Sequence, residues 1–420
     1  MQNWAGNYRY AATALHRPET VAEVQEIVAG SAGAVRALGS RHSFNGVADT
    51  TGALISQERL DRVLEIAPER RTVTVEGGAR YGTLARRLHA EGFALPNLAS
   101  LPHISVAGAV ATATHGSGND NACLAAPVRA LEFVAADGSL VSLDRERDGD
   151  AFRGAVVSLG GLGIVTRLTL DVVPTFAVRQ DVYENLSFAA LEENFDAVTG
   201  GAYSVSLFTD WAEPRFYQAW LKSRVEPDAV ASAAPADFFG AVRAERDLHP
   251  IPEVSAENCT PQRGIPGPWH ERLPHFRLEF TPSRGEELQS EYLLPRENAL
   301  PALRAVYALG KQIAPLLLTS EVRTVAADDL WLSPFCGRAS VAFHFTWKPD
   351  WPAVRSLLPA LEEALTPFDA RPHWGKLAQI PPVRLRALYP RLSDFGELLR
   401  TYDPRGRFRN AFLDSLLAPP

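Results

Sequence analysis

The sequence predicts an α+β protein with two domains and a returning tail. Three observations in the 420-residue chain lead to this prediction. The first third alternates strand-like and helix-like segments, the middle carries strands of regularly alternating polarity, and the last segment has helical spacing again. We therefore expect a first domain over residues 1–175, a second over 176–380 with an antiparallel sheet, and a C-terminal segment, 381–420, that packs on the first domain.

The composition narrows the classes of function. Lys and Arg together number 42 and Asp and Glu 49, which gives a formal net charge of −7. This charge argues against nucleic acid or an anionic membrane surface as a partner. The three cysteines form no CxxC pair, so neither a disulfide framework nor a metal site is expected. The first residues carry no signal-peptide pattern, and no run of about 18 apolar residues occurs. The expected protein is therefore cytoplasmic and has no membrane span. We also expect a monomer.

Hydrophobic periodicity places the elements of the first domain. Val21, Val24 and Val28 share one helical face after the helix-start residue Thr20. Asp137-Gly138 lies between two strand-like runs, which is a strong hairpin signal. The expected order is a helix over 18–28, strands over 34–38 and 72–75, helices over 81–90 and 106–114, strands over 128–134 and 139–143, a helix over 152–159 and a strand over 164–172.

The second domain is predicted from period-two alternation. Strands are expected over 204–209, 216–222, 276–281, 319–325 and 341–347, with a helical stretch over 300–313 between the last of them. This pattern is typical of a mostly antiparallel sheet with helices on one face. Residues 225–270 are rich in Ala and Pro and are expected to form long loops. The tail over 393–417 is expected to be a helix and an ending that packs on the first domain.

Two loops of small residues are the first candidates for a binding site. The run from Gly39 to Gly46 directly follows a predicted strand, and its small residues let backbone N–H groups form an anion-binding nest. Inside this nest His42 either has a hydrogen-bonding role only or takes part in chemistry. The run from Ser105 to Gly118 is also made of small residues, and it would allow a pyrophosphate to approach the backbone closely.

Three other motifs resemble known binding motifs but lack a feature that each of these motifs requires. The glycine run from Leu159 to Val165 resembles a dinucleotide fingerprint, but it stands between a helix and a strand instead of between a strand and a helix, so no nicotinamide-type site is expected. The segment from His270 to His275 has one residue too many for HExxH, and Pro274 breaks the helix that this motif needs. Gly375-Lys376 lacks the upstream loop of a P-loop.

Polar residues follow one face of the last two predicted strands. Glu321 and Arg323 are two positions apart and therefore share a face, as do His344 and Thr346. Phe343, Phe345 and Trp347 alternate with the second pair and are expected to pack in the core. The polar residues, with Lys376 nearby, would suit a hydroxylated substrate if they line one cleft. Ion pairs on a solvated sheet face are the alternative interpretation.

These residues together carry a resemblance to a known family. The chain resembles the alditol (xylitol/sorbitol) oxidases of the vanillyl-alcohol-oxidase flavoprotein family, which are relatives of the sugar-lactone oxidases. The similarity begins at Asn3 and covers nearly the whole chain. Its most specific stretches run from Leu95 to Ser105, from Tyr203 to Trp211, from Pro268 to Phe276 and from His373 to Lys376.

The resemblance implies a two-domain FAD-binding PCMH-type fold in which the antiparallel sheet is the substrate-binding cap domain. It implies that residues 1–175 and the tail hold FAD. It also implies that His42 carries the flavin through a covalent bond to the C8-methyl carbon. Family loops often have a second glycine where this chain has Arg41, and the arginine would add a phosphate or carboxylate contact.

The resemblance also implies the roles of single residues. His344 would be the base, with Lys376 assisting it. Arg323 or Lys376 would stabilise negative charge on the reduced flavin. The substrate would be held by Ser100, Gln289, Glu321, Arg323, His344, Thr346 and Lys376. FAD would contact Gly39, Ser40, Arg41, His42, Ser43, Ser100, Ser105, Gly108, Thr112, Ala113, Thr114, His115, Gly163, Ile164, Val165 and His373.

The activity implied is oxidation of the terminal CH2OH of an alditol to the aldose, with O2 reduced to H2O2. A sugar-lactone oxidase, or a dehydrogenase that passes electrons to another acceptor, is the alternative within the same fold. A catalytically silent carbohydrate-binding protein is the alternative of another class. The silent protein is disfavoured because the full set of expected site residues is present: His42, Ser100, Glu321, Arg323, His344 and Lys376.

Overall fold

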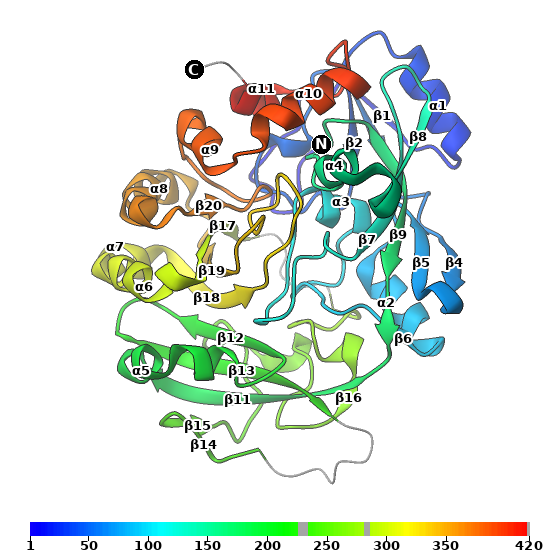
Figure 1. Ribbon diagram of the computed structural model, residues 1–420. Helices are drawn as coiled ribbons and strands as arrows, with labels where there is room; N and C mark the ends of the chain where they lie inside the picture. Colours follow the sequence, from blue (N-terminus) through cyan, green and yellow to red (C-terminus); the bar gives the residue numbers. More distant parts are fainter. Residues whose placement is uncertain (226–233, 281–285, 418–420) are drawn as a thin grey trace.

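The computed structural model describes residues 1–225, 234–280 and 286–417. Its strands form sheets of three, two, five and ten strands. The three smaller sheets belong to the first 175 residues, and the ten-stranded sheet spans residues 177–372. Figure 1 shows the large sheet in green to orange beside the blue and cyan elements of the first part. The α+β class expected from the sequence is confirmed.

The first part contains one parallel and two antiparallel sheets. The parallel sheet has the order β1 (Ala14–His16), β3 (Ala53–Ser56), β2 (Val35–Leu38). The five-stranded antiparallel sheet has the order β4 (Val63–Ala67), β5 (Thr72–Glu76), β9 (Ile164–Asp171), β7 (Val128–Val134), β8 (Leu140–Asp144), and β6 (Phe93–Ala94) pairs with β10 (Val173–Pro174). The predicted hairpin joins β7 to β8, where Gly138 has a φ of 86°. Glycine adopts this left-handed backbone without a steric penalty.

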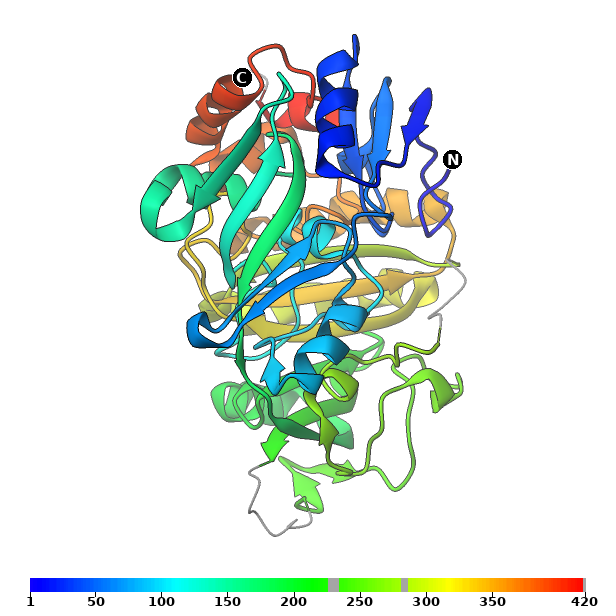
Figure 2. The same ribbon diagram turned by 90° about the vertical axis from the view of Figure 1, so that its right-hand side faces the viewer.

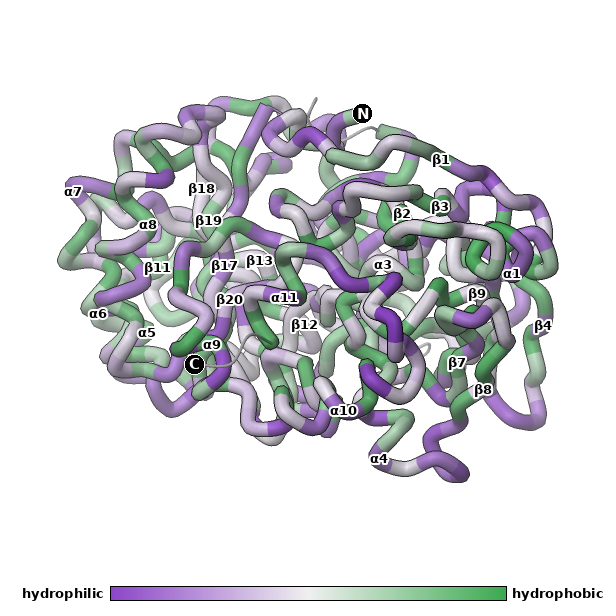
Figure 3. The backbone as a smooth tube through the Cα atoms, turned by 90° about the horizontal axis from the view of Figure 1, so that it is seen from above, coloured by the Kyte–Doolittle hydropathy of each residue, from purple (hydrophilic) through white to green (hydrophobic). Residues whose placement is uncertain are grey.

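Four helices accompany these sheets. They are α1 (Val21–Gly30), α2 (Tyr81–Ala90), α3 (Val106–Ala111) and α4 (Arg145–Val156). Thr20 caps α1 because its side chain accepts a hydrogen bond from the backbone N–H of Glu23. Helix α4 begins with a charged turn that the sequence did not predict, and Asp144 caps this turn by accepting from the backbone N–H groups of Glu146 and Arg147. Gly149, with a φ of 48° and a ψ of −113°, interrupts the helix between this turn and the part that was predicted. This hydrophilic turn is a purple segment at the lower edge of Figure 3.

The ten-stranded sheet is antiparallel throughout. Its order is β14 (Asp237–Phe238), β15 (Ala241–Arg243), β11 (Ala177–Ser187), β13 (Arg215–Val225), β12 (Ser204–Thr209), β18 (Leu317–Val325), β19 (Ser340–Trp347), β17 (Leu288–Pro295), β20 (Arg371–Pro372), and β16 (Gly267–Pro268) also pairs with β11. The sequence missed β11 and β17, the second of which stands in the middle of the candidate site.

One face of this sheet is packed and the other is polar. Phe343, Phe345 and Trp347 of β19 are fully buried and belong to one apolar cluster, as the alternation predicted. The same cluster contains buried residues of α5 (Phe188–Thr199), α6 (Ala299–Ala308) and α8 (Trp351–Leu365), and α7 (Gly310–Ile313) follows α6. The helices thus cover one face, as Figure 1 shows. The opposite face of β17, β19 and β18 is left to line a cavity.

The tail contains α9 (Pro382–Leu388), α10 (Leu392–Tyr402) and α11 (Ala411–Leu417). It contacts the first part of the chain: the Asn410 amide donates to the backbone oxygens of Gly46, Val47 and Asp49, and Phe408 packs in a core with Val24 and Val28. In Figure 2 the red tail lies next to the blue N-terminal elements. Within the described part of the chain, no helix has the length and apolar character that a membrane span requires.

One predicted strand is wrong. Residues 276–280 form no strand, and Thr281 lies outside the described residues. Phe276 forms a single bridge with Cys259, and its backbone N–H donates to the Ser100 oxygen. The apolar residues alternate here although the segment is not part of the sheet. The segment instead lies against the loop that contains Ser100.

Candidate active site

A cavity of about 330 Å³ lies between the small-residue loops of the first part and the polar face of the large sheet. We call it the central cavity. It brings together most of the site residues expected from the sequence: Gly39, Ser40, Arg41, His42, Ser43, Ser100, Gly108, Thr112, Thr114, His115, Gly163, Val165, Gln289, Glu321, Arg323, His344, Thr346, His373 and Lys376. Ser105, Ala113 and Ile164 do not line it. Within the described residues, no cluster of His, Cys, Asp or Glu could hold a metal ion.

Two glycines form a close backbone cradle at one wall. A Cβ at Gly39 would lie 2.7 Å from Ser105 Oγ, and one at Gly108 would lie 2.8 Å from the same atom. Ser105 stands directly behind this wall, where it exchanges backbone-to-side-chain hydrogen bonds with Ser40. Arg41 has a φ of 63°, in the left-handed region that favours glycine. The loop therefore keeps this bend even with an arginine, whose side chain lines the cavity.

Two of the expected cofactor contacts, Ala113 and Ile164, lie behind the cavity lining for reasons that the backbone shows. Ala113 is fully buried with a φ of 51°, and it turns the chain between Thr112 and Thr114, which do face the cavity. A Cβ at Gly163 would lie 2.3 Å from the Val134 backbone oxygen, so only glycine fits there. Ile164 pairs with Val134 in the sheet and packs in the core behind.

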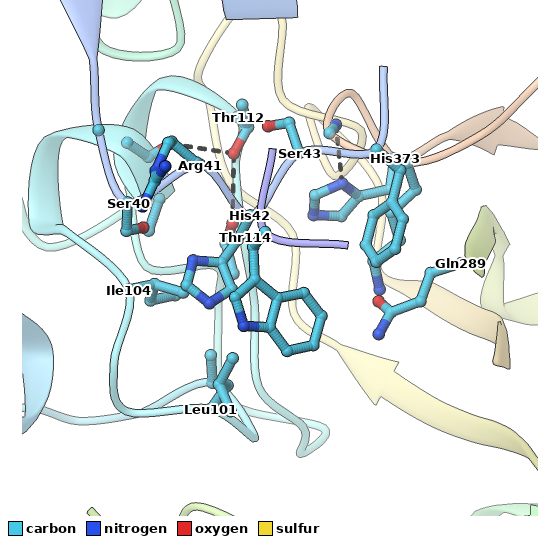
Figure 4. A pocket seen from close by; sticks show the side chains of 18 of the residues that line it. Ser40, Arg41, His42, Ser43, Leu101, Ile104, Thr112, Thr114, Gln289 and His373 are labelled. Atoms are coloured by element: carbon cyan, nitrogen blue, oxygen red, sulfur yellow. Dashed lines mark hydrogen bonds between the residues drawn. The ribbon is translucent and has the colours of Figure 1, made fainter. Parts of the chain in front are cut away.

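His42 is held at the edge of this cradle. Its ring stacks on Trp4, with centroids 5.1 Å apart and planes 23° apart. Its Nδ1 atom is buried without a hydrogen-bond partner. Burial lowers the pKa of His42 to about 4, so the ring is neutral at neutral pH. Figure 4 shows His42 with Ser40 and Thr112 on one side of the pocket, opposite His373 and Gln289.

The polar wall has its groups in rows across three strands. Glu291 of β17 pairs with His344 of β19, which pairs with Glu321 of β18. The next row is Gln289 beside Thr346. Because opposite residues in adjacent strands point to the same face, the pairing places these side chains together above the cradle.

Glu291 is the centre of this wall, although it is not among the residues expected from the sequence. One of its carboxylate oxygens accepts from Lys376 Nζ at 2.6 Å, and the other accepts from Arg323 Nη2 at 2.8 Å. His115 Nε2 lies 3.3 Å from the second oxygen. The Glu291 side chain is 1% exposed. Its position two residues after Gln289 was the available signal, since both fall on one face of a strand.

The charges around Glu291 determine its protonation state. Burial alone would raise the pKa of the Glu291 carboxyl, but the Lys376 and Arg323 cations hold it well below its usual range. With Glu321 also ionised, the two buried carboxylates of this wall face its two cations, Lys376 and Arg323, and balance their charge. Glu287 adds a further carboxylate to the cavity lining, where it accepts a hydrogen bond from Gln289. The buried part of the wall therefore accommodates a neutral, hydroxylated molecule better than an ion.

Replacing Glu291 by glutamine is expected to lower the free energy of unfolding by about 2 kcal/mol, because two buried cations lose their carboxylate. Urea unfolding of the purified protein measures the change. Glu65→Gln serves as the control, since both side chains of the Glu65–Arg70 ion pair are exposed and the pair is worth less than about 0.5 kcal/mol. Equal losses in the two variants would contradict the central position of Glu291.

His344 has a partner at each ring nitrogen. Nε2 lies 3.0 Å from Thr346 Oγ1, and Nδ1 lies 2.8 Å from Lys376 Nζ and 3.7 Å from Glu291 Oε2. Burial and the neighbouring Lys376 ammonium lower the pKa of His344 to about 4. The ring is therefore neutral at neutral pH and able to take a proton.

Glu321 is fixed by a histidine that the sequence analysis had not selected. His275 Nε2 lies 2.9 Å from Glu321 Oε1, and both residues are buried. Arg323 Nε lies 3.5 Å from Glu321 Oε2, and Arg323 Nη1 donates to Ser100 Oγ at 3.3 Å. Burial opposes ionisation, but the charge of Arg323 holds the pKa of Glu321 below its usual range. The wall thus offers acceptor and donor groups side by side.

Comparison with known proteins identifies the family. Residues 12–144 match a family described as FAD binding domain, and residues 282–416 match one described as D-arabinono-1,4-lactone oxidase. The chain is 54% identical to an alditol oxidase of Streptomyces sp., over 99% of this chain and 98% of that one. It is 29% identical to an L-gulono-1,4-lactone dehydrogenase of Mycobacterium tuberculosis, over 99% of both chains.

The fold has matches among solved structures as well. The cholesterol oxidase of B. sterolicum superposes with a TM-score of 0.76, at 16% identity, over 99% of this chain and 96% of that one. At this identity the likeness shows the fold alone. The 54% identity to the Streptomyces enzyme extends over nearly the full length of both chains, and the FAD-binding match covers the cradle. The chain therefore belongs to the alditol oxidase family of FAD-binding oxidoreductases, which are relatives of the sugar-lactone oxidases.

Proposed function

We propose that this protein oxidises the terminal CH2OH of an alditol such as xylitol or sorbitol to the aldose, with O2 reduced to H2O2. The observation that carries the proposal is the placement of a charge-balanced wall of hydrogen-bonding groups opposite a glycine cradle that ends at His42. A polyol is neutral and carries a hydroxyl on every carbon, so it matches such a wall.

The cradle fits FAD. Gly39 and Gly108 line the cavity without a side chain, so the backbone there is open to a phosphate group, and Tyr10 contributes a buried hydroxyl without a partner to the same cavity. We assign FAD to residues 1–175 and 381–420, the substrate to residues 176–380, and the covalent attachment to His42. When bound, FAD supplies a two-electron acceptor that takes hydride from the alcohol carbon and is reoxidised by O2.

The proton of the reacting hydroxyl goes to His344 in this proposal. In the structure the Lys376 ammonium, which can only donate, lies 2.8 Å from Nδ1, so Nδ1 is the acceptor and Nε2 carries the ring hydrogen that faces Thr346. For Nε2 to take the substrate proton, Lys376 Nζ must turn away from Nδ1 while it keeps its 2.6 Å bond to Glu291, so that the ring hydrogen can lie on Nδ1. The substrate hydroxyl then replaces Thr346 as the partner of Nε2. Glu291, whose Oε2 lies 3.7 Å from Nδ1, then stabilises the imidazolium that forms. Lys376 and Arg323 remain cationic and stabilise negative charge that develops on the bound cofactor.

The other hydroxyls of the substrate are held by the remaining polar groups. Glu321 accepts hydrogen bonds, and Ser100, Gln289 and Thr346 both donate and accept them. A buried group left without its partner costs about 1–3 kcal/mol, so the wall selects molecules with several hydroxyls. The monomeric state and cytoplasmic location expected from the sequence belong to the same proposal.

The proposal is tested by incubating the purified flavoprotein with xylitol in air. We expect one H2O2 and one aldose for each polyol consumed, with the aldehyde carbon identified by NMR. A colourless protein would support the silent carbohydrate-binding alternative. A yellow protein that turns over a lactone and not a polyol would support the lactone alternative, which the match of residues 282–416 favours.

The rate of cofactor reduction is expected to be constant from about pH 8 to about pH 5. A base must be neutral before it accepts a proton, and His344 is neutral above its lowered pKa of about 4. The rate therefore falls as the pH drops through about 4, whereas an ordinary histidine would lose it near 6.5. Stopped-flow absorbance measures the rate, and circular dichroism at each pH monitors folding. A midpoint near 6.5 would remove His344 as the base.

A further inference from the structure

The segment from Arg272 to Phe276 has no role in the proposed chemistry, although it stands in a stretch that carries the family resemblance. It forms a buried turn that reaches the central cavity through His275 and Phe276. We call it the His275 turn. Its near match to a zinc motif has no chemical meaning, because within the described residues the structure contains no metal-binding cluster. The contacts of the turn indicate a different task.

The His275 turn contacts two groups of the proposed substrate site at once. The backbone N–H of His275 donates to the Ser100 backbone oxygen at 3.1 Å. The side chain of His275 reaches the Glu321 carboxylate at 2.9 Å. Ser100 belongs to the first part of the chain and Glu321 to the large sheet, so one residue sets the spacing between groups that arise from different parts of the fold.

The ring of His275 is held by two aromatic neighbours. It makes edge contacts with Phe208 and Trp220, whose centroids lie 5.7 and 5.2 Å away. Burial lowers the pKa of His275, so the ring is neutral and Nε2–H is the donor to Glu321. Nδ1 is buried and has no partner, so the bond to Glu321 is the one polar contact of this ring.

A buried lysine anchors the turn from behind. Lys222 is fully buried on β13, and its Nζ donates to the backbone oxygens of Arg272 and Pro274 and to the Gln180 side chain. Thr260 adds a bond from its hydroxyl to Pro274 O at 2.8 Å. Three acceptors match the three N–H bonds of an ammonium group, and they fix the backbone on the N-terminal side of His275.

We infer that His275 is a positioning residue that sets substrate affinity: its Nε2–H holds the Glu321 carboxylate in the orientation that accepts hydroxyl hydrogens of a polyol. The inference rests on the proposed function and adds a specificity determinant to it. Lys222 acts indirectly, because it holds the backbone of the turn that positions His275. Loss of the donor leaves Glu321 free to rotate toward Arg323, which weakens binding of the polyol without removing the base.

The test compares three variants by anaerobic reduction of the bound flavin with xylitol. His275→Phe keeps the ring and its edge contacts but loses the donor. We expect it to raise the xylitol dissociation constant by about 10- to 100-fold while the limiting rate changes less than about 3-fold. His275→Gln restores an N–H at similar reach and should lie within about 3-fold of the wild type. His89→Phe, outside the cavity, is the matched control.

A double-mutant cycle separates positioning from general structure. In a Glu321→Gln background, His275→Phe is expected to change the dissociation constant by less than about 3-fold, because the two residues act as one unit. Flavin content and melting temperature check folding, and His275→Asn, whose shorter amide does not reach Glu321, is the second variant if His275→Phe does not fold.

Three results would overturn the inference: wild-type affinity in His275→Phe, equal losses in the Phe and Gln variants, or additive losses in the cycle. A wild-type flavin that xylitol fails to reduce would overturn the proposed function first, and the inference with it, before any variant is compared. The two failures are therefore distinguishable.

Discussion

His344→Ala is expected to slow anaerobic reduction of the flavin by xylitol by about 10²- to 10⁴-fold, the usual contribution of a general base. The alcohol releases hydride readily only if its O–H proton leaves in step, and His344 is the neutral ring at the polar wall with a carboxylate behind it. Removing it leaves Thr346 and Lys376 without a group that takes this proton at neutral pH.

The measurement is stopped-flow absorbance of the flavin at saturating xylitol. The melting temperature and flavin content of the variant should remain close to those of the wild type, because the ring lies at a cavity wall. His16→Ala, in β1 outside this cavity, is the matched control. If His344→Ala lost stability and reduction rate to the same extent, the residue would be structural, and the base would have to be sought elsewhere.

His42→Ala is expected to convert the flavin from an acid-stable to a dissociable group. The imidazole is neutral, its Nδ1 has no competing partner, and Trp4 holds the ring at the cradle. In the wild type nearly all of the yellow colour should stay with the acid-precipitated chain, and in the variant nearly all should appear in the supernatant. Absorbance of pellet and supernatant measures the partition.

His89→Ala, a histidine outside the cavity, provides the comparison. It should keep its colour in the pellet as the wild type does. Acid-stable colour in His42→Ala would show that another residue forms the bond, and it would remove His42 from the role assigned to it.

The elements that the sequence predicted well are those whose pattern is local. The helix over 81–90 was predicted with its observed bounds, and the alternation of Phe343, Phe345 and Trp347 with His344 assigned each face of β19. The prediction failed at Phe276, where apolar alternation had another cause. A segment that leaves a sheet to bind a distant loop has contacts that local periodicity does not encode.

The candidate site was harder to predict because its groups meet through strand order. Glu291 acquires its role from the strand order β17, β19, β18. This order brings its carboxylate to Lys376 and to Arg323. His275 acquires its role because a turn crosses to Ser100. Both arrangements depend on contacts between residues far apart in the chain. The glycine loop of His42 could be found from sequence because its residues are contiguous.

The most direct test of the central claim is a single anaerobic mixing experiment. We propose that a polyol bound at the charge-balanced wall reduces a flavin attached at His42. Mixing the yellow protein with excess xylitol in the absence of O2 should bleach the flavin band completely, and readmitting O2 should restore it. A flavin that stays yellow with xylitol and sorbitol, while a sugar lactone bleaches it, would contradict the account.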